Sequence, residues 1–263
     1  MGQDKLGLWP ISPKAQTRGQ REASTQSRRA SLSQSPKRFR NSESYSSAMS
    51  SAMASSMAKN SSPFKVVLGS SSPARREILA DMGYEFTVMC ADIDERAIRR
   101  EKPEELVKAL AEAKAEAIKL KLHGEDSAQE RDQPTILITS DQVMVSKGMI
   151  RERPKGQEEA REFIKGYSGD KAFAVNYVLV TNLSNGASKG GWDIPEIYFH
   201  HIPEDFIKSV VKEGHMTCVA GGLKLTHPSV LPFIKQLIGT MDSVRGLPRE
   251  LTERLIQEVL GAK

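Results

Sequence analysis

The sequence predicts an α/β protein with a mixed sheet flanked by helices and preceded by a disordered N-terminal tail. Three observations support this fold class. Short apolar segments alternate with segments of helical periodicity, the second half contains one long hairpin pattern, and 263 residues are enough to bury a core. A composition of 38% hydrophobic and 27% charged residues excludes a membrane-helix bundle and a wholly disordered chain. No stretch approaches 18 consecutive apolar residues, so we expect no membrane partner.

In the first half of the folded body, the sequence pattern predicts buried strands separated by two helices. Residues 64–69 are an apolar run typical of a strand, and Ser72 and Pro73 then supply an N-cap and a first-turn proline for a helix that stops at Gly83. A longer helix begins at Pro103. Its apolar face is expected to contain Leu106, Ala109, Leu110, Ala113, Ala117 and Leu120. The other elements expected in this half are a strand at 85–90, a polar loop at 123–133 and a short strand at 135–138 that ends at Ser140 and Asp141.

The second half alternates in the same way around one hairpin. Residues 172–183 alternate as a strand does, and Asn185 and Gly186 form a hairpin turn signal ahead of a partner strand at 192–202. The helices expected here are 157–165 with Gly166 as its stop, 203–213 with Gly214 as its stop, and two stretches after Gly221 and Gly222, the last of them at 251–260.

Residues 1–62 differ in composition from the single folded domain expected at 63–263. They contain sixteen serines, and their ten basic and three acidic residues give a net charge of +7, whereas the body carries −2. Such a segment buries too little apolar surface to offset the entropy of ordering. It is either an untargeted tail of a cytoplasmic protein or a transit peptide for a plastid or mitochondrion. Because the positive charge lies in the tail, the +5 of the whole chain is weak evidence for a nucleic-acid partner, and we expect none.

The strongest local signal for chemistry lies at residues 69–76, between a strand end and a helix N-terminus. Ser70 and Ser72 supply hydroxyls, while Arg75 and Arg76 supply two cations beside free backbone N–H groups. These groups favour a phosphate. The Gly-Lys-Ser/Thr of a Walker A loop is missing. The alternative is an ordinary N-cap followed by two solvated arginines.

A few other charged residues are candidates for the same chemistry. Asp141, which follows an apolar strand, is suited to hold Mg²⁺ or to orient a water, and Glu95 is a second candidate carboxylate. Arg153 could present a cation to a phosphate, and Lys114 would by itself be taken for a surface residue. The alternative for Asp141 is an ordinary turn residue, and for Glu95 it is a solvated acidic turn. For Arg153 it is a solvated loop arginine. Cysteines number only two, too few for a four-ligand zinc site.

Taken together and in this order, the motifs resemble the Maf family of nucleoside triphosphate pyrophosphatases, over about residues 64–260. The matching positions are Ser70, Ser72, Arg75 and Arg76 in the family's Ser-x-Ser-x-x-Arg-Arg motif, Asp141 in Asp-Thr-x-Val, Lys114 in Leu-Ala-x-x-Lys-Ala, Arg153 in Lys-Pro, and the segments 163–169, 196–199, 220–222 and 246–248. The resemblance implies a Maf- and ITPase-like mixed sheet with a central cleft. It also makes a homodimer unsurprising, although the sequence does not specify the oligomeric state.

The resemblance also implies a reaction and a set of roles. A nucleoside triphosphate would be hydrolysed between its α and β phosphates, in an enzyme that removes non-standard or excess nucleotides. By analogy Asp141 would accept the proton of the attacking water and, with Glu95, hold a divalent cation, Mg²⁺ or Mn²⁺. The groups expected to neutralise the triphosphate are Ser70, Ser72, Arg75, Arg76, Lys114 and Arg153.

Three departures from the family pattern concern the choice of base. Members that act on dTTP and UTP carry Arg, Thr and Gln where this chain has Ala74, Gln142 and Thr226. A branch that selects a methylated base carries tryptophan at the first of these positions, which is also absent. The preferred base therefore stays open. Because all three pyrimidine-selecting residues are absent, the alternative function is a catalytically weak regulator that binds a nucleotide or a nucleic acid.

Overall fold

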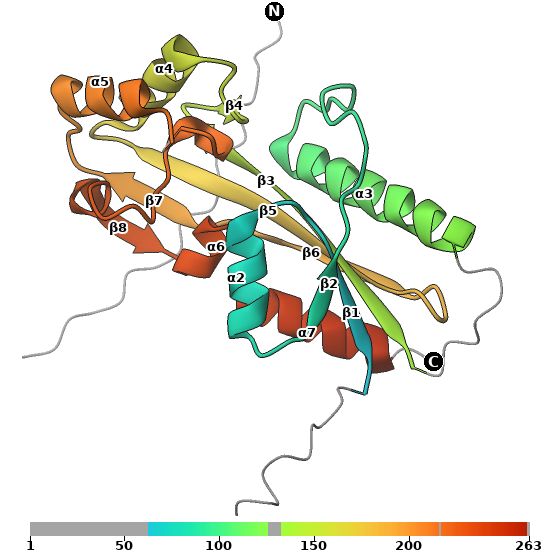
Figure 1. The fold of residues 1–263 in the computed structure, drawn as a ribbon. Coiled ribbons are helices and arrows are strands. Elements are labelled where there is room, and N and C mark those ends of the chain that lie inside the picture. The colour runs from blue at the N-terminus through green and yellow to red at the C-terminus, as the bar shows by residue number, and fades with distance from the viewer. Residues whose placement is uncertain (1–62, 126–132, 216, 262–263) are drawn as a thin grey trace, which may run out of the picture. The chain divides into compact units, whose positions relative to one another are not determined.

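The computed structural model describes residues 63–125, 133–215 and 217–261 (Figure 1). The predicted tail at 1–62 and most of the predicted loop at 123–133 lie outside these residues, and residues 123–125 prolong a helix instead of opening the loop. The strands are β1 Lys65–Gly69, β2 Phe86–Val88, β3 Thr135–Ser146, β4 Met149–Arg151, β5 Lys171–Asn182, β6 Ser188–Asp193, β7 Glu196–Phe199 and β8 Ile234–Ile238. The α-helices are α2 Pro73–Asp81, α3 Pro103–Glu125, α4 Gln157–Tyr167, α5 Glu204–Glu213, α6 Met241–Val244 and α7 Arg249–Gly261, with short 3-10 turns at Ala220–Gly222 (η1) and Leu231–Phe233 (η2).

The strands form one eight-stranded mixed sheet, in the order β2-β1-β3-β5-β7-β8. β1 pairs in parallel with β2 and β3, whereas β3 and β5 pair antiparallel. β4 extends the sheet beside β3, and β6 extends it beside β5. The predicted fold class, a mixed sheet with flanking helices, is confirmed. Among the described residues no helix is long and apolar enough to cross a membrane.

One edge of β3 is shared by two short strands that do not meet. β1 pairs with β3 as far as Thr139, and β4 pairs with it from Met144 onward. In the described part of the chain, residues 140–143 therefore have no strand partner on this side, although β5 covers their other side. We call residues 140–143 the open edge of β3. Side chains from neighbouring elements can reach the backbone only where a strand edge is left open in this way.

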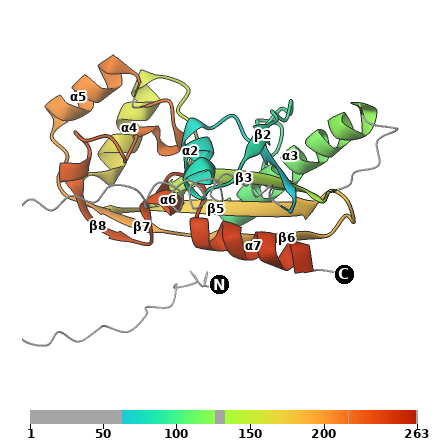
Figure 2. The same cartoon turned by 60° about the horizontal axis from the view of Figure 1, so that its bottom comes forward.

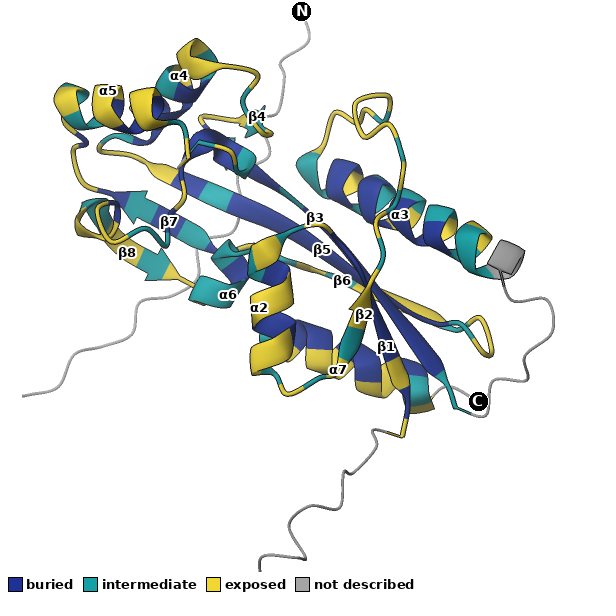
Figure 3. Cartoon of the chain, in the orientation of Figure 1, coloured by how far each residue is buried: buried dark blue, intermediate teal, exposed yellow. Residues whose placement is uncertain are grey.

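Helices cover both faces of the sheet around the open edge. α3 packs on one face, against a buried cluster that includes Val67, Leu137 and Val143, while α2 and α7 pack on the other face (Figures 1 and 2). A third cluster joins α4 and α5 to the far end of the sheet. The centre of the sheet is buried throughout (Figure 3). Because side chains alternate along a strand, odd-numbered residues of β3 face α3, whereas Ile136 and Ile138 face α2 and α7, and Met144, farther along the same face, packs with the α4 and α5 cluster.

Local signals placed several helix ends correctly. α2 begins at Pro73, and the Ser72 hydroxyl accepts a hydrogen bond from the backbone N–H of Arg75 at 3.5 Å, as an N-cap should. α5 ends at Gly214, whose φ of 75° is the left-handed conformation that terminates helices. Gly166, by contrast, lies inside α4 and does not stop it, so that predicted boundary was wrong.

Strand lengths were the commonest error. β3 runs twelve residues rather than four, so Asp141 lies within a strand and not after one. The strand predicted at 192–202 is two strands, β6 and β7, separated around Pro195. β4 and β8 were not predicted, and β8 lies in the region after Gly222 for which only helices were expected. Each missed strand is only three or five residues long, too short for its own periodicity to identify it.

The predicted apolar face of α3 was also wrong in part. Leu120 is 73% exposed, and Ala109, Ala113 and Ala117 are only half-buried. The residues that α3 buries are Leu106, Val107, Leu110, Ala111, Lys114, Ala115 and Ile118. The face was misplaced because a lysine was assigned to solvent, whereas Lys114 lies at its centre.

Candidate active site

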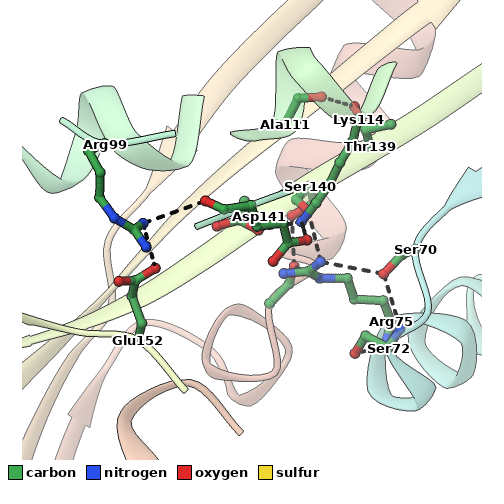
Figure 4. Close-up of polar contacts among 12 residues, drawn as sticks. Ser70, Ser72, Arg75, Arg99, Ala111, Lys114, Thr139, Ser140, Asp141 and Glu152 are labelled. Carbon is green, nitrogen blue, oxygen red and sulfur yellow. Dashed lines mark hydrogen bonds and ion pairs between the residues drawn. The ribbon is translucent and has the colours of Figure 1, made fainter. Parts of the chain in front are cut away.

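A buried ion pair forms the centre of the candidate site (Figure 4). The Lys114 Nζ lies 2.5 Å from Asp141 Oδ1 and 2.9 Å from Glu95 Oε1. Asp141 and Lys114 are only 8% and 9% exposed, whereas the Glu95 side chain is 55% exposed. α3 therefore delivers one cation to two carboxylates, one within the sheet and one from the loop between β2 and α3. The three residues that the sequence suggested separately are in contact.

Asp141 is placed by the open edge of β3. Its odd number turns it toward α3, and its neighbour Ser140 exposes its backbone carbonyl at the edge where β1 has ended. Burial raises the pKa of the Asp141 carboxyl, and the Glu95 charge acts in the same direction. Lys114 and Arg75 oppose this effect without overcoming it. A carboxylate with a raised pKa binds a proton more readily, which suits a proton acceptor.

Arg75 reaches the open edge from α2, on the other side of the sheet. Its Nη1 donates to the Ser140 carbonyl oxygen at 2.8 Å and, at 3.4 Å, to the Ser70 hydroxyl, while its Nε donates to the Gly246 carbonyl oxygen at 2.9 Å. The residue is 9% exposed. Burial lowers the pKa of the guanidinium, and the Asp141 and Glu95 charges counteract this. An arginine guanidinium is charged throughout the physiological pH range, so Arg75 is a cation.

The two predicted serines shape the turn before α2. Ser70 accepts a hydrogen bond from the backbone N–H of Ser72 at 3.2 Å as well as the one from Arg75, and Ser72 caps the helix. Ser70 is buried, at 7% exposure. Arg76 is exposed and donates to the Ser71 carbonyl oxygen at 3.4 Å. Of the two adjacent arginines, only Arg75 joins the cluster around Asp141.

Arg153 lies in the exposed segment that follows β4. Its neighbour Glu152 forms an ion pair with Arg99 at 3.4 Å (Figure 4). Arg99 also donates to the backbone carbonyl of Glu95 at 3.5 Å. This contact links the Arg153 segment to the loop that carries Glu95. Sequence reasoning missed Arg99 and Glu152. The only signal was the charge run at 95–102, which does not single out one arginine.

The turn at 243–246, which comprises the last two residues of α6 and the two that follow it, completes the cluster. The Gly246 carbonyl oxygen accepts hydrogen bonds from Arg75 Nε and, at 3.0 Å, from the Ser140 hydroxyl. Gly246 has φ +93°, and a Cβ atom there would lie 3.1 Å from the Arg75 Nε. Both its conformation and its contact with Arg75 therefore favour glycine. Sequence reasoning recognised the 246–248 segment but gave it no role.

The three positions linked to base choice lie in different surroundings. Ala74 is half-buried in the first turn of α2, and Thr226 is half-buried in the segment after η1. Gln142 faces away from Asp141, since adjacent strand residues point to opposite faces. Its Nε2 donates to the carbonyl oxygens of Val244, at 2.9 Å, and Ser243, at 3.4 Å.

The carboxylates are suited to a hard divalent cation only together with a substrate. Within the described residues no group of three or more His, Cys, Asp or Glu side chains is arranged to hold a metal ion. Asp141 and Glu95 offer oxygen donors, but the Lys114 ammonium contacts both. Magnesium is commonly bound by one or two carboxylates plus phosphate oxygens, and this donor set fits that pattern.

Comparison with known proteins identifies the family. The family model described as "Maf-like protein" matches residues 65–259. A 7-methyl-GTP pyrophosphatase from Dictyostelium discoideum is 39% identical over 194 residues, which cover 74% of this chain and 96% of that protein. A dTTP/UTP pyrophosphatase from Alkaliphilus metalliredigens is 28% identical, with 70% and 90% covered, and a 7-methyl-GTP pyrophosphatase from Nitrosococcus oceani is 31% identical, with 74% and 94% covered. Since the family model matches most of the chain, and a relative at 39% identity is matched over almost its whole length, the chain belongs to the Maf-like family.

Proposed function

We propose that this protein is a nucleoside triphosphate pyrophosphatase that releases pyrophosphate and a nucleoside monophosphate, with its reaction centre at Asp141. The observation that carries the proposal is the buried Lys114–Asp141 pair at the open edge of β3, with Arg75 reaching the same edge from the opposite face. The names of the relatives, which are pyrophosphatases of nucleoside triphosphates, support the same reaction.

The residues divide into a proton acceptor and a set of cations. Asp141 takes a proton from a water whose oxygen attacks the α-phosphorus, and the bond from that phosphorus to the α–β bridging oxygen breaks. The electron pair leaves with pyrophosphate. Lys114, Arg75 and Arg153 balance the triphosphate charge and the charge that grows on the leaving group. Ser70 and Ser72 hold the turn that leads into α2, the helix from which Arg75 projects, and the exposed Arg76 adds positive charge next to that turn.

A divalent cation is part of the proposal, with Mg²⁺ or Mn²⁺ as the candidates. Asp141 and Glu95 would hold it, with phosphate oxygens completing the coordination. When bound, the ion supplies positive charge that neutralises the phosphate oxygens. Lys114 would then share the two carboxylates with it. Because the Lys114 ammonium is carried on a flexible four-carbon stem, it can turn toward the phosphates when a second cation binds.

For the base, we propose 7-methyl-GTP as the first substrate to test. The relative at 39% identity is named a 7-methyl-GTP pyrophosphatase, and the dTTP/UTP relative is less similar, at 28%. This chain also lacks the three residues associated with pyrimidine substrates, having Ala74, Gln142 and Thr226 instead, and Ala74 equally differs from the tryptophan of the methylated-base branch. The base proposal therefore rests on the similarity to the relative at 39% identity. Hydrogen bonds in the base pocket discriminate because a buried polar group left without a partner costs about 1–3 kcal/mol.

The experiment is a nucleotide panel with the full chain. The standard ribo- and deoxyribonucleoside triphosphates and 7-methyl-GTP are each incubated with Mg²⁺ or Mn²⁺, and pyrophosphate and phosphate are measured separately. We expect pyrophosphate with little free phosphate, and the highest kcat/KM for 7-methyl-GTP. A higher kcat/KM for dTTP or UTP would overturn the base assignment. Binding of nucleotides without turnover of any of them would overturn the enzyme assignment and favour the regulator.

A further inference from the structure

We infer that Arg99 is a further phosphate-binding residue of the candidate site, and that Glu152 holds its guanidinium while no nucleotide is bound. This inference rests on the proposed function, because it assigns Arg99 to the triphosphate of the same substrate. Neither residue belongs to the motifs identified in the sequence. The competing interpretations are a structural link between two loops and a solvated ion pair without a role.

Arg99 lies beside the reaction centre, on the loop between β2 and α3 that also carries Glu95. Its Nη1 donates to the backbone carbonyl oxygen of Glu95 at 3.5 Å. The Glu95 side chain lies 2.9 Å from the Lys114 Nζ, which pairs with Asp141. In this chain of contacts only Glu95 stands between Arg99 and the buried ion pair. Figure 4 shows Asp141 between Arg99 and Arg75, so cations approach it from two sides.

The Arg99 guanidinium has donors available for a ligand. Within the described residues all its hydrogen bonds come from Nη1, which donates to the carbonyls of Ile98 and Glu95 and to the Glu152 carboxylate. Nε and Nη2 have no partner in that part of the chain, and the side chain is 51% exposed. Nε and Nη2 form one edge of the planar guanidinium fork, which matches two oxygens of a phosphate. Arg99 can therefore bind a phosphate through two nitrogens.

The ion pair between Arg99 and Glu152 is weak enough to exchange. The two side chains are 51% and 46% exposed, and the atoms that pair lie 3.4 Å apart. Exposed pairs of this kind contribute little to stability, because water competes for both partners. A triphosphate carries several negative charges, so it attracts the guanidinium more strongly than one carboxylate does.

The segment after β4 does not need this ion pair for its position. The backbone carbonyl of Glu152 accepts a hydrogen bond from the N–H of Gly221 at 3.0 Å, and β4 pairs with β3 as far as Arg151. These backbone contacts fix the residue before Arg153 without help from its side chain. Among the described residues the Glu152 carboxylate contacts only Arg99. Its effect is therefore to keep that cation close to the site.

The three interpretations predict different pairs of results. If Arg99 binds phosphate, loss of its charge weakens substrate binding, whereas loss of the Glu152 charge strengthens it, because Arg99 no longer has to leave an ion pair. If the pair is a structural link, either loss weakens binding. If the pair has no role, neither loss has an effect. A charge-assisted hydrogen bond corresponds to about tenfold in affinity, and an exposed ion pair to about two- to fivefold.

The test uses the full chain and inorganic tripolyphosphate, a ligand that carries no base. Its affinity is measured by calorimetry, and kcat/KM is measured for one nucleotide that the wild type hydrolyses. We expect Arg99→Gln to lower both by about tenfold, and Arg99→Lys, which keeps the charge, to lose less. Glu152→Gln should raise the tripolyphosphate affinity about two- to fivefold, and this gain should be absent in Arg99→Gln/Glu152→Gln.

The neighbouring arginine is the matched control. Arg100 is exposed, and within the described residues its guanidinium donates to the Arg99 carbonyl oxygen and to no carboxylate. Arg100→Gln removes the same charge from the same loop, so it should leave the tripolyphosphate affinity and kcat/KM unchanged. Equal losses in Arg100→Gln and Arg99→Gln would show a general effect of charge and overturn the specific role of Arg99.

Three further results would overturn the inference while leaving the proposed function intact. They are wild-type affinity and kcat/KM in Arg99→Gln, weaker binding in Glu152→Gln, and a gain from Glu152→Gln that persists when Arg99 is also replaced. The second indicates a structural link, and the third indicates simple repulsion between Glu152 and the ligand. A wild type that neither binds tripolyphosphate nor hydrolyses any nucleotide would instead refute the proposed function, and the role of Arg99 with it.

Discussion

Replacing Arg75 with lysine tests how much the guanidinium contributes through its fork geometry rather than its charge. Arg75 makes two short hydrogen bonds from different nitrogens, 2.9 Å from Nε to Gly246 and 2.8 Å from Nη1 to Ser140, and a longer one of 3.4 Å to Ser70. A lysine ammonium keeps the charge but replaces the fork by a single nitrogen. Its three N–H bonds radiate from one atom and cannot reproduce the separation of Nε and Nη1, so we expect it to retain one of the two short bonds.

The expected cost follows from the contacts that remain. A hydrogen bond from a charged donor contributes about 1.5–3 kcal/mol. The Gly246 carbonyl keeps its hydrogen bond from the Ser140 hydroxyl, so Arg75→Lys leaves no buried acceptor without a partner there. We therefore expect the free energy of unfolding to fall by about 2 kcal/mol, less than the 3–5 kcal/mol typical of an uncompensated buried charge.

The adjacent arginine is the matched control. Arg76 is exposed and makes one long hydrogen bond, to Ser71, so Arg76→Lys should change stability by less than about 0.5 kcal/mol. Urea unfolding of the full chain measures both variants. The assignment of Arg75 to the buried cluster would be refuted if the two variants lost the same stability within about 0.5 kcal/mol.

Three further predictions follow from other contacts. Lys114→Met leaves Asp141 buried without its lysine partner and should lower the free energy of unfolding by about 3 kcal/mol. The double variant Lys114→Met/Asp141→Asn should recover part of that stability. Equal stability of the wild type and Lys114→Met in urea unfolding would contradict the buried pair. Gly246→Ala should destabilise the protein more than Gly83→Ala in the same assay. Both glycines have positive φ, but of the two only Gly246 has other atoms within 4 Å of where a Cβ would lie. Equal losses of stability in the two variants would argue against that contact. Tyr84 donates a hydrogen bond to Glu253 at 2.6 Å, and burial, followed by the Glu253 contact, raises the pKa of the Tyr84 hydroxyl above its ordinary value of 10.0. The hydrogen bond should therefore contribute about 1 kcal/mol to the free energy of unfolding at neutral pH, and this contribution is lost as the pH rises beyond 10. In urea titrations the difference in stability between the wild type and Tyr84→Phe should narrow at alkaline pH, and a constant difference would disprove the coupling.

Local sequence patterns predicted the elements whose information is local. β1 contains the buried apolar residues Val66, Val67 and Leu68 in a row, and α2 carries its own N-cap and first-turn proline, so each could be placed without knowing the rest of the fold. β8 could not be placed in this way. Its five residues are only partly buried, and it is a strand because it pairs with β7, which lies more than thirty residues earlier in the chain.

The same distinction applies to the site. The sequence placed Ser70, Arg75 and Asp141 among the candidates because each sits in a recognisable local motif. It could not separate Arg75 from Arg76, since the difference lies in acceptors supplied by β3 and by a turn near the C-terminus. Likewise Lys114 is buried because Asp141, 27 residues later, lies beside it. A charged residue on a helix reveals such a partner only in the folded chain.

The most direct measurement of the central claim compares pyrophosphate release by the full chain and by Asp141→Asn. The substitution keeps the size of the side chain and removes its capacity to accept a proton, and it leaves Lys114 paired with Glu95. With 7-methyl-GTP and Mg²⁺ or Mn²⁺, we expect the wild type to release pyrophosphate and the variant to lose at least a hundredfold in kcat, on the order of what general-base catalysis contributes. A folded Asp141→Asn variant with wild-type kcat would contradict the assignment of the reaction to this site.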